Sequence, residues 1–180
     1  DGDGGENLTA QRAGFLSSVA IIANFGNSSS TPRTQAGSGV IYKLDKATGD
    51  AYIITNYHVV YYHDGRSKIS NDIEVYLYGL VAEPYAIEAT YLGGSMNYDI
   101  AVLKVSDSFL LKEEPVTAAT VSDSELLRAL DPVIAIGNAE GEGFSATKGS
   151  VSVASEYLTM QAPNGRTDIT VRVIRVDTAI

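Results

Sequence analysis

Residues 54–60 read Ile54-Thr55-Asn56-Tyr57-His58-Val59-Val60 and place a histidine directly after an apolar run. The residues from Ala51 to Thr55 are mostly apolar and β-branched, which predicts a strand. An imidazole at the end of a strand can move a proton near neutral pH, so it is a candidate general base. A partly buried histidine bonded to backbone is the ordinary alternative, and this stretch alone leaves both interpretations open.

A second stretch offers a partner for that histidine. Residues 99–105 read Asp99-Ile100-Ala101-Val102-Leu103-Lys104-Val105, an acid followed by a nearly continuous apolar run. Such a run predicts a strand buried on both faces, and a carboxylate at its start can be partly buried. A carboxylate bonded to one ring nitrogen fixes the tautomer of a catalytic histidine and stabilises its protonated form. Asp99 is therefore a candidate orienting acid for His58, although a simple strand-entry Asp is the plainer alternative.

Short apolar runs separated by turn residues make up most of the remaining chain. Many strands at this spacing predict an all-β protein, either a sandwich or a barrel. In the last run the alternation slips at Val173-Ile174, which predicts a β-bulge. The runs cover residues 18–24, 39–44, 51–55, 73–78, 87–91, 100–105, 133–136, 145–154 and 169–176.

Few segments are expected to be helical or irregular. A short helix is predicted around Ser124–Arg128, with a turn at His58–Tyr61. The Gly-, Ser- and Thr-rich stretch Gly26–Gly39 predicts a long loop, and Tyr157–Thr167 a hairpin-type loop. The first seven residues hold three Gly and three acids, which predicts a solvated tail.

Composition excludes several classes of protein. The chain has 180 residues with 13 Lys and Arg against 22 Asp and Glu, for a net charge of −9. Nucleic-acid binding needs a basic face, so no nucleic-acid partner is expected. No apolar run reaches the roughly 18 residues of a spanning helix. The absence of Cys excludes disulfides, thiolate metal sites and a Cys nucleophile within these residues.

Five blocks occur in order along the chain: Gly37–Ile41, Ile54–Val60, Asp99–Val105, Val133–Ser152 and Val173–Ile180. Together they resemble the HtrA/Deg type of trypsin-like serine protease. The resemblance implies an all-β, chymotrypsin-like double β-barrel with an active site between the barrels, the second barrel being incomplete in this chain. It implies an acidic, Gly-rich segment at 1–14, a first barrel at 15–112, and the N-terminal part of the second barrel at 113–180.

The same resemblance implies roles for individual residues. His58 matches the general base and Asp99 the acid that orients it. Ala179 and Ile180 fall near the base of the substrate pocket, where no acid is present to pair with Lys or Arg, so cleavage after Val, Ala or Ile is expected. No cofactor and no metal is implied. His58 and His63 with Asp64 could ligate a metal, but a solvated turn at Tyr62–Gly65 is the expected alternative.

No residue of the chain matches the family's nucleophile. The segment resembling Asp177–Ile180 leads, in this family, directly into the nucleophilic Ser and the oxyanion hole, so the Ser is expected just beyond Ile180 or on a companion chain. Three arrangements are open: a C-terminal companion fragment produced by a cut at Ile180, a shortened piece of a longer chain, or a natural inactive half. The chain's own candidates are expected to be structural: Ser38, Ser145, Ser150 and Ser152.

The expected function is therefore a serine endopeptidase that hydrolyses misfolded or regulatory proteins by Ser-His-Asp acyl transfer. The alternative is a non-catalytic module that holds peptides on a protease fold. The resemblance also suggests an extracytoplasmic location, whether secreted, surface-anchored or periplasmic. It suggests a homotrimer formed through the N-terminal region, where the apolar residues are Leu8, Phe15 and Leu16.

Overall fold

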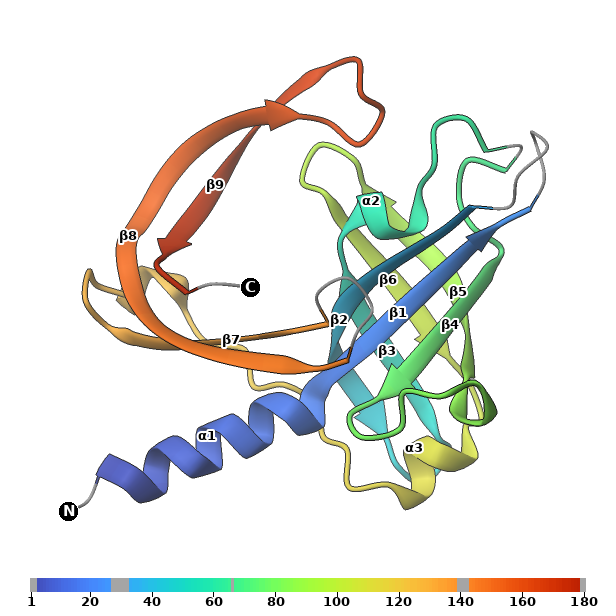
Figure 1. Ribbon diagram of the computed structural model, residues 1–180, viewed down its shortest axis with the longest axis horizontal. Coiled ribbons are helices and arrows are strands. Elements are labelled where there is room, and N and C mark those ends of the chain that lie inside the picture. Colours follow the sequence, from blue (N-terminus) through green and yellow to red (C-terminus); the bar gives the residue numbers. More distant parts are fainter. Residues whose placement is uncertain (1–2, 27–32, 66, 139–142, 179–180) are drawn as a thin grey trace.

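Six antiparallel strands close into a barrel in the computed structural model, which describes residues 3–26, 33–65, 67–138 and 143–178 (Figure 1). The last strand of the barrel pairs with the first, as Val19 with Leu77 and Ile21 with Val75. In spatial order the strands are β1 (Ser18–Phe25), β2 (Arg33–Asp45), β3 (Asp50–Thr55), β6 (Ile100–Val105), β5 (Ile87–Ser95) and β4 (Asp72–Leu77).

Alternate residues of these strands fill the barrel. Antiparallel strands with one face toward solvent direct every second side chain into the core. This corrects the expectation that β6 is buried on both faces: Ala101, Leu103 and Val105 are buried, whereas Ile100 is 46% exposed. Fully buried core residues from the barrel strands include Val19, Ile21, Ile41, Ile53, Ile73, Val75, Leu77 and Leu103.

A separate sheet of three strands, β7 (Pro132–Gly137), β8 (Ser145–Gln161) and β9 (Asp168–Val176), arches beside the barrel (Figure 1). Within the described part of the chain β9 pairs with β8 alone, so the expected incomplete second barrel is confirmed. The register also shifts opposite the end of β9, as the slipped alternation predicted. The extra residues, however, belong to β8, between Val151 and Glu156.

Two segments differ from the sequence-based expectation. The N-terminal segment is a helix, α1 (Asp3–Ser17), which begins inside the tail predicted for the first seven residues. The helix has no continuous apolar stripe, so the sequence shows no 3.6-residue period there. β2 begins at Arg33, inside the stretch expected to be a loop. Its first residues pair with β1 from Phe25↔Arg33 to Ser18↔Val40, and backbone pairing of this kind does not need large apolar side chains.

The remaining helices are short. α2 (Tyr57–Val60) forms at the predicted turn, and the 3₁₀ helix η2 (Ser124–Leu126) lies where a short helix was predicted. α3 (Phe109–Glu113) and the 3₁₀ helix η1 (Glu83–Tyr85) were not predicted. In the part of the chain that the structure describes, no helix has the length and apolar character needed to cross a bilayer.

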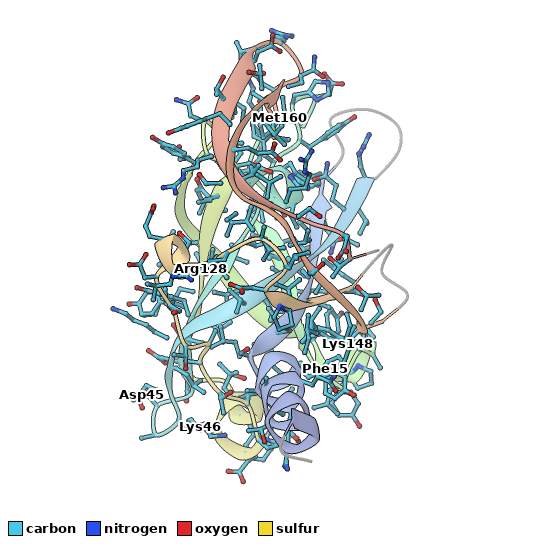
Figure 2. The ribbon with its side chains drawn as sticks, turned by 90° about the vertical axis from the view of Figure 1, so that its left-hand side faces the viewer. Phe15, Asp45, Lys46, Arg128, Lys148 and Met160 are labelled. Carbon is cyan, nitrogen blue, oxygen red and sulfur yellow. The ribbon has the colours of Figure 1, made fainter. Side chains whose placement is uncertain are left out.

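The C-terminal end of α1 is held on the barrel by an aromatic cluster. The rings of Phe15 and Tyr78 lie 4.5 Å apart between centroids, and those of Tyr78 and Phe144 5.7 Å apart. The carbonyl of Leu16 accepts a hydrogen bond from the N–H of Thr117 at 3.0 Å. Figure 2 shows Phe15 on the same side of the molecule as Lys148. The side chain of Leu8 lies outside the described part of the structure.

Candidate active site

His58 and Asp99 lie side by side where β3 ends and β6 begins. His58 Nδ1 is 2.7 Å from Asp99 Oδ2, and the backbone N–H of His58 donates to Asp99 Oδ1 at 2.9 Å. Both carboxylate oxygens therefore bond the same residue, one through its ring and one through its backbone. This two-point contact fixes the plane of the carboxylate relative to the imidazole.

The sheet register brings the two residues together across 41 positions of sequence. Thr55 pairs with Ala101, so the residue that follows one strand meets the residue that precedes the other. Asn56 Nδ2 donates to Asp99 Oδ2 at 3.2 Å and to the Asp99 carbonyl at 3.1 Å. The N–H of Tyr57 also donates to that carbonyl at 3.1 Å. Asp99 adopts φ of 51°, a left-handed conformation that Asp and Asn tolerate better than most residues.

The exposure of the pair suits proton transfer. The Asp99 side chain is 13% exposed, whereas that of His58 is 60% exposed. A neutral imidazole whose Nδ1–H donates to a carboxylate carries its acceptor lone pair on Nε2. No residue in the described ranges bonds Nε2, so this nitrogen is open to a proton donor from outside. The arrangement can remove a proton from a bound hydroxyl and return it to a leaving group.

A four-residue helix carries His58, and β2 holds that helix in place. A helix this short leaves its carbonyls without partners of its own. The amide of Gln35, with its nitrogen toward α2, donates to the carbonyls of His58 at 2.8 Å and Val59 at 3.1 Å. A Cβ on Gly37 would lie 2.5 Å from Val59 Cγ2, so only glycine lets α2 approach this closely. No sequence motif points to Gln35, which lies in the stretch expected to be a loop.

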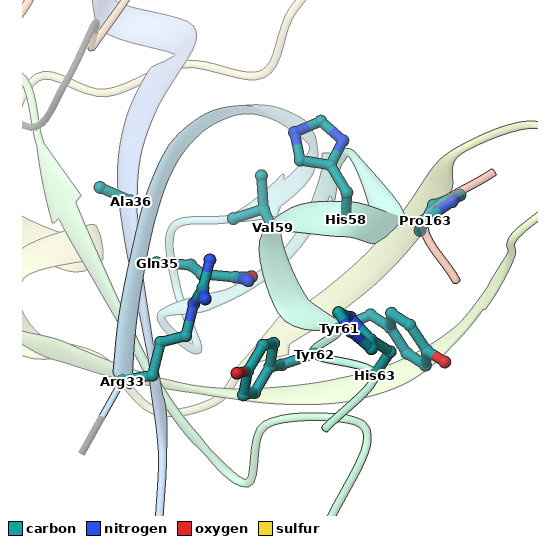
Figure 3. Close-up of a pocket in the computed structure, with 9 residues that line it drawn as sticks. All are labelled: Arg33, Gln35, Ala36, His58, Val59, Tyr61, Tyr62, His63 and Pro163. Carbon is teal, nitrogen blue, oxygen red and sulfur yellow. The ribbon is translucent and has the colours of Figure 1, made fainter. Parts of the chain in front are cut away.

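An open hollow of about 390 Å³ begins at His58 (Figure 3). Figure 3 shows Arg33, Gln35 and Ala36 along β2, with His58 and Val59 above them on α2. Tyr61, Tyr62 and His63 form another wall, and Pro163 reaches the hollow from the tip of the β8–β9 hairpin. The loop predicted at 157–167 is shorter than expected, because β8 continues to Gln161, and its tip lies next to the candidate base.

The predicted substrate-pocket residues, Ala179 and Ile180, lie outside the described residues. The chain just before them is held against β8. The carboxylate of Asp177 accepts from the N–H of Ser150 at 2.5 Å and from its hydroxyl at 3.0 Å. These hydrogen bonds from Ser150, the backbone one first, lower the pKa of Asp177. Because the Ser150 hydroxyl is bonded to Asp177, its role is structural.

His63 and Asp64 contact each other. His63 Nε2 lies 3.0 Å from Asp64 Oδ2, and both side chains are largely exposed. Among the described residues, no group of three or more His, Asp or Glu side chains is arranged to hold a metal ion.

Comparison with known proteins identifies relatives of the chain. The model of the trypsin-like peptidase domain matches residues 37–180. The serine protease Do-like HtrA of Lactococcus lactis strain IL1403 is 38% identical over 162 residues, which are 87% of this chain and 35% of that protein. The serine protease Do-like HtrA of Bacillus subtilis is 38% identical over 176 residues, 97% of this chain and 34% of that protein. The chain thus spans about a third of the length of these relatives.

Solved structures share the fold. The active form of the Rv3671c protease from M. tuberculosis has a TM-score of 0.67 and 20% identity, covering 99% of this chain and 66% of that one. Deg5 has a TM-score of 0.66 and 23% identity, covering 100% of this chain and 76% of its own. The fold is therefore chymotrypsin-like, with one closed barrel and part of a second. By its match over residues 37–180, the chain belongs to the trypsin-like peptidase domain family.

Proposed function

We propose that the protein carrying this chain is a serine endopeptidase of the HtrA/Deg type. The observation that carries the proposal is the 2.7 Å contact between His58 Nδ1 and Asp99 Oδ2, with Nε2 turned outward and open. Relatives named as HtrA serine proteases align over most of this chain, which supports the same chemistry here.

His58 acts as the general base of an acyl transfer. Its Nε2 takes the proton of a serine hydroxyl as that oxygen attacks the peptide carbonyl, and then gives the proton to the leaving amine. Asp99 holds the imidazole in the required tautomer and stabilises its protonated form. Water then repeats the cycle and releases the second product. The serine comes from the segment that follows Ile180 in a longer protein, or from a companion chain.

The proposed substrates are unfolded or regulatory proteins, cleaved after small aliphatic residues. The family resemblance puts Ala179 and Ile180 near the base of the substrate pocket, and because neither residue is charged, Val, Ala or Ile is the expected residue before the cut. The protein acts outside the cytoplasm; one relative, 34% identical over 116 residues, is a probable periplasmic DegP-like endoprotease of Buchnera aphidicola. A homotrimer forms through Leu8, Phe15 and Leu16 near the N-terminus.

The direct test uses the full-length protein and an unfolded protein substrate. His58→Ala removes the base, and the account predicts a loss of about 10⁴-fold or more in kcat. Phe109→Ala is the matched control: it truncates a ring that is 71% exposed on α3, away from the pair. Unchanged turnover in His58→Ala would refute the proposal. Binding of peptides with no turnover in the wild type would favour the non-catalytic peptide-binding module.

A further inference from the structure

Two hollows lie on either side of the segment Tyr61–His63. The first, of about 390 Å³, begins at His58 and includes Arg33. The second, of about 440 Å³, includes Lys68 and, from the β8–β9 hairpin, Arg166. Tyr61 and His63 line both, so the hollows form one continuous surface beside the candidate base.

The charge of this surface is opposite to that of the whole chain. Acids outnumber basic residues 22 to 13 in the sequence. The residues lining the two hollows nevertheless include no Asp or Glu, while they include both histidines and three cations. A surface lined by positive charges on an otherwise acidic chain attracts anionic groups to this place. The cations are Arg33, Lys68 and Arg166.

In the described part of the chain, these cations form no ion pairs with carboxylates. The guanidinium of Arg33 lies over the ring of Tyr62, 4.5 Å from its centroid, which leaves the edge of its planar fork for hydrogen bonds. No ion pair engages Arg33, Lys68 or Arg166 within the described ranges, and all three are exposed. Some cations elsewhere are ion-paired, as Lys112 is with Asp107 at 2.5 Å and Arg172 with Glu125 at 2.6 Å.

The carboxylates that border the surface are themselves bonded to histidine. Asp99 bonds the ring of His58 at 2.7 Å, and Asp64 bonds that of His63 at 3.0 Å. Each of these two carboxylates thus has an imidazole as a direct neighbour. An incoming carboxylate would meet Arg33 on one side of Tyr61–His63, and Lys68 with Arg166 on the other.

We propose that this surface binds acidic side chains of the substrate polypeptide on the leaving-group side of the scissile bond. The inference rests on the proposed function, because it uses the role of His58. A general base that returns its proton to the leaving amine has the leaving chain beside it. The first residues after the scissile bond then lie over the hollow that His58 lines. The fork of Arg33 matches a carboxylate in two hydrogen bonds, and the rings of Tyr61 and Tyr62 pack against the aliphatic stem.

The kinetic test compares paired peptides in the full-length protein. Each pair has Glu or Gln at one of the three positions after the scissile bond, or at the matching positions before it. We expect kcat/KM to be about threefold to tenfold higher for Glu on the leaving side, as one or two partly exposed ion pairs would give. The preference disappears at about 1 M salt, where exposed charges are screened. No preference on the leaving side overturns the inference.

Variants assign the preference to named cations. Arg33→Gln and Lys68→Gln should each lower the ratio of kcat/KM for the Glu peptide to that for the Gln peptide toward one. Because two residues are tested, a folding defect in one variant does not decide the result. Arg128→Gln is the matched control, because Arg128 is exposed and lines neither hollow (Figure 2). Equal ratios in Arg33→Gln, Lys68→Gln and the control overturn the inference.

A binding experiment separates this inference from the proposed function. Fluorescence anisotropy with full-length His58→Ala measures Kd for the labelled Glu and Gln peptides without turnover. Tighter binding of the Glu peptide, lost in the added Arg33→Gln background, supports the surface even if the wild type hydrolyses nothing. Equal affinities with normal hydrolysis overturn the surface alone. Binding of inorganic tripolyphosphate without binding of the Glu peptide also overturns it.

Discussion

The closed barrel and the three-stranded sheet differ in how they bury apolar side chains. In the barrel, strand after strand contributes residues that are at most 1% exposed, such as Ile53 and Leu103. In the sheet, Val151 is fully buried, but Tyr157 and Leu158 are 73% and 46% exposed. A closed barrel has no edge, whereas an open sheet presents edges and an uncovered face. Stability of this chain therefore resides in the barrel.

This difference matters for the proposed chemistry. The histidine and the acid that orients it both extend from barrel strands, β3 and β6, so their 2.7 Å contact is held by the best-packed part of the molecule. The residues predicted to form the substrate pocket follow β9 in the open sheet. The proton-transfer pair thus lies on the best-packed part of the molecule, whereas the residues predicted to form the substrate pocket follow the less packed part.

The largest effect is expected at the pair itself. Asp99→Asn keeps a side chain that tolerates φ of 51°, but its amide nitrogen favours the wrong tautomer of His58. We expect kcat to fall about 10⁴-fold, as the Ser-His-Asp template indicates, with little change in the free energy of unfolding. Peptide hydrolysis and urea unfolding measure the two quantities.

A matched control exists in the same barrel. Asp107 also has φ of 51°. Its exposed carboxylate pairs with Lys112 and not with His58. Asp107→Asn should leave kcat within about twofold of the wild type, since surface substitutions of this kind have small effects. Equal losses in both variants would mean that Asp99 acts through the fold and not through His58.

The next prediction compares the same substitution, Leu to Ala, in the barrel and in the three-stranded sheet. Leu103→Ala in the barrel should lower the free energy of unfolding by about 2–5 kcal/mol, because it opens a cavity in a closed core. Leu158→Ala in the sheet should cost less than about 1 kcal/mol, because that side chain is already 46% exposed. Urea unfolding of the full-length protein measures both, and similar losses would contradict the contrast.

A smaller effect is expected at the anchor of α2. Gln35→Met keeps the approximate shape of the side chain but leaves the carbonyls of His58 and Val59 without their donor. The unfolding free energy should fall by about 1–3 kcal/mol, the usual cost of an unpaired polar group. Tyr42→Met, on the outer face of the same strand, serves as the control. No difference between the two variants would remove Gln35 from the account.

The smallest effect, and one that depends on pH, is expected in the sheet. Hydrogen bonds from Ser150 lower the pKa of Asp177 below its ordinary 3.8, so the ionised carboxylate stabilises the folded state. This contribution is present above pH 3.8 and is lost as the pH falls through the lower, folded-state pKa. Asp177→Asn should be less stable than the wild type at neutral pH and should converge with it in acid. A constant difference at all pH values would contradict this.

The sequence alone predicted the strands that have a clear period and the two residues of the pair. Ile73–Leu77 alternates and is β4, and the His58 and Asp99 stretches each flank an apolar run that became a strand. It did not predict α1 or the first half of β2. Those segments are stabilised by backbone pairing and by tertiary contacts such as that of Phe15 with Tyr78. Such contacts produce no periodic pattern of apolar residues in the sequence. The role of Gln35 likewise depends on where a distant helix packs.

The central claim is that His58 activates a serine nucleophile. Labelling of the full-length protein with a fluorophosphonate, followed by mass spectrometry, tests this directly because such reagents need an activated serine. The account predicts one adduct, on a serine outside residues 1–180, formed about 10³-fold more slowly or not at all in His58→Ala. An adduct on a serine within residues 1–180, or equal labelling rates in the two proteins, would contradict it.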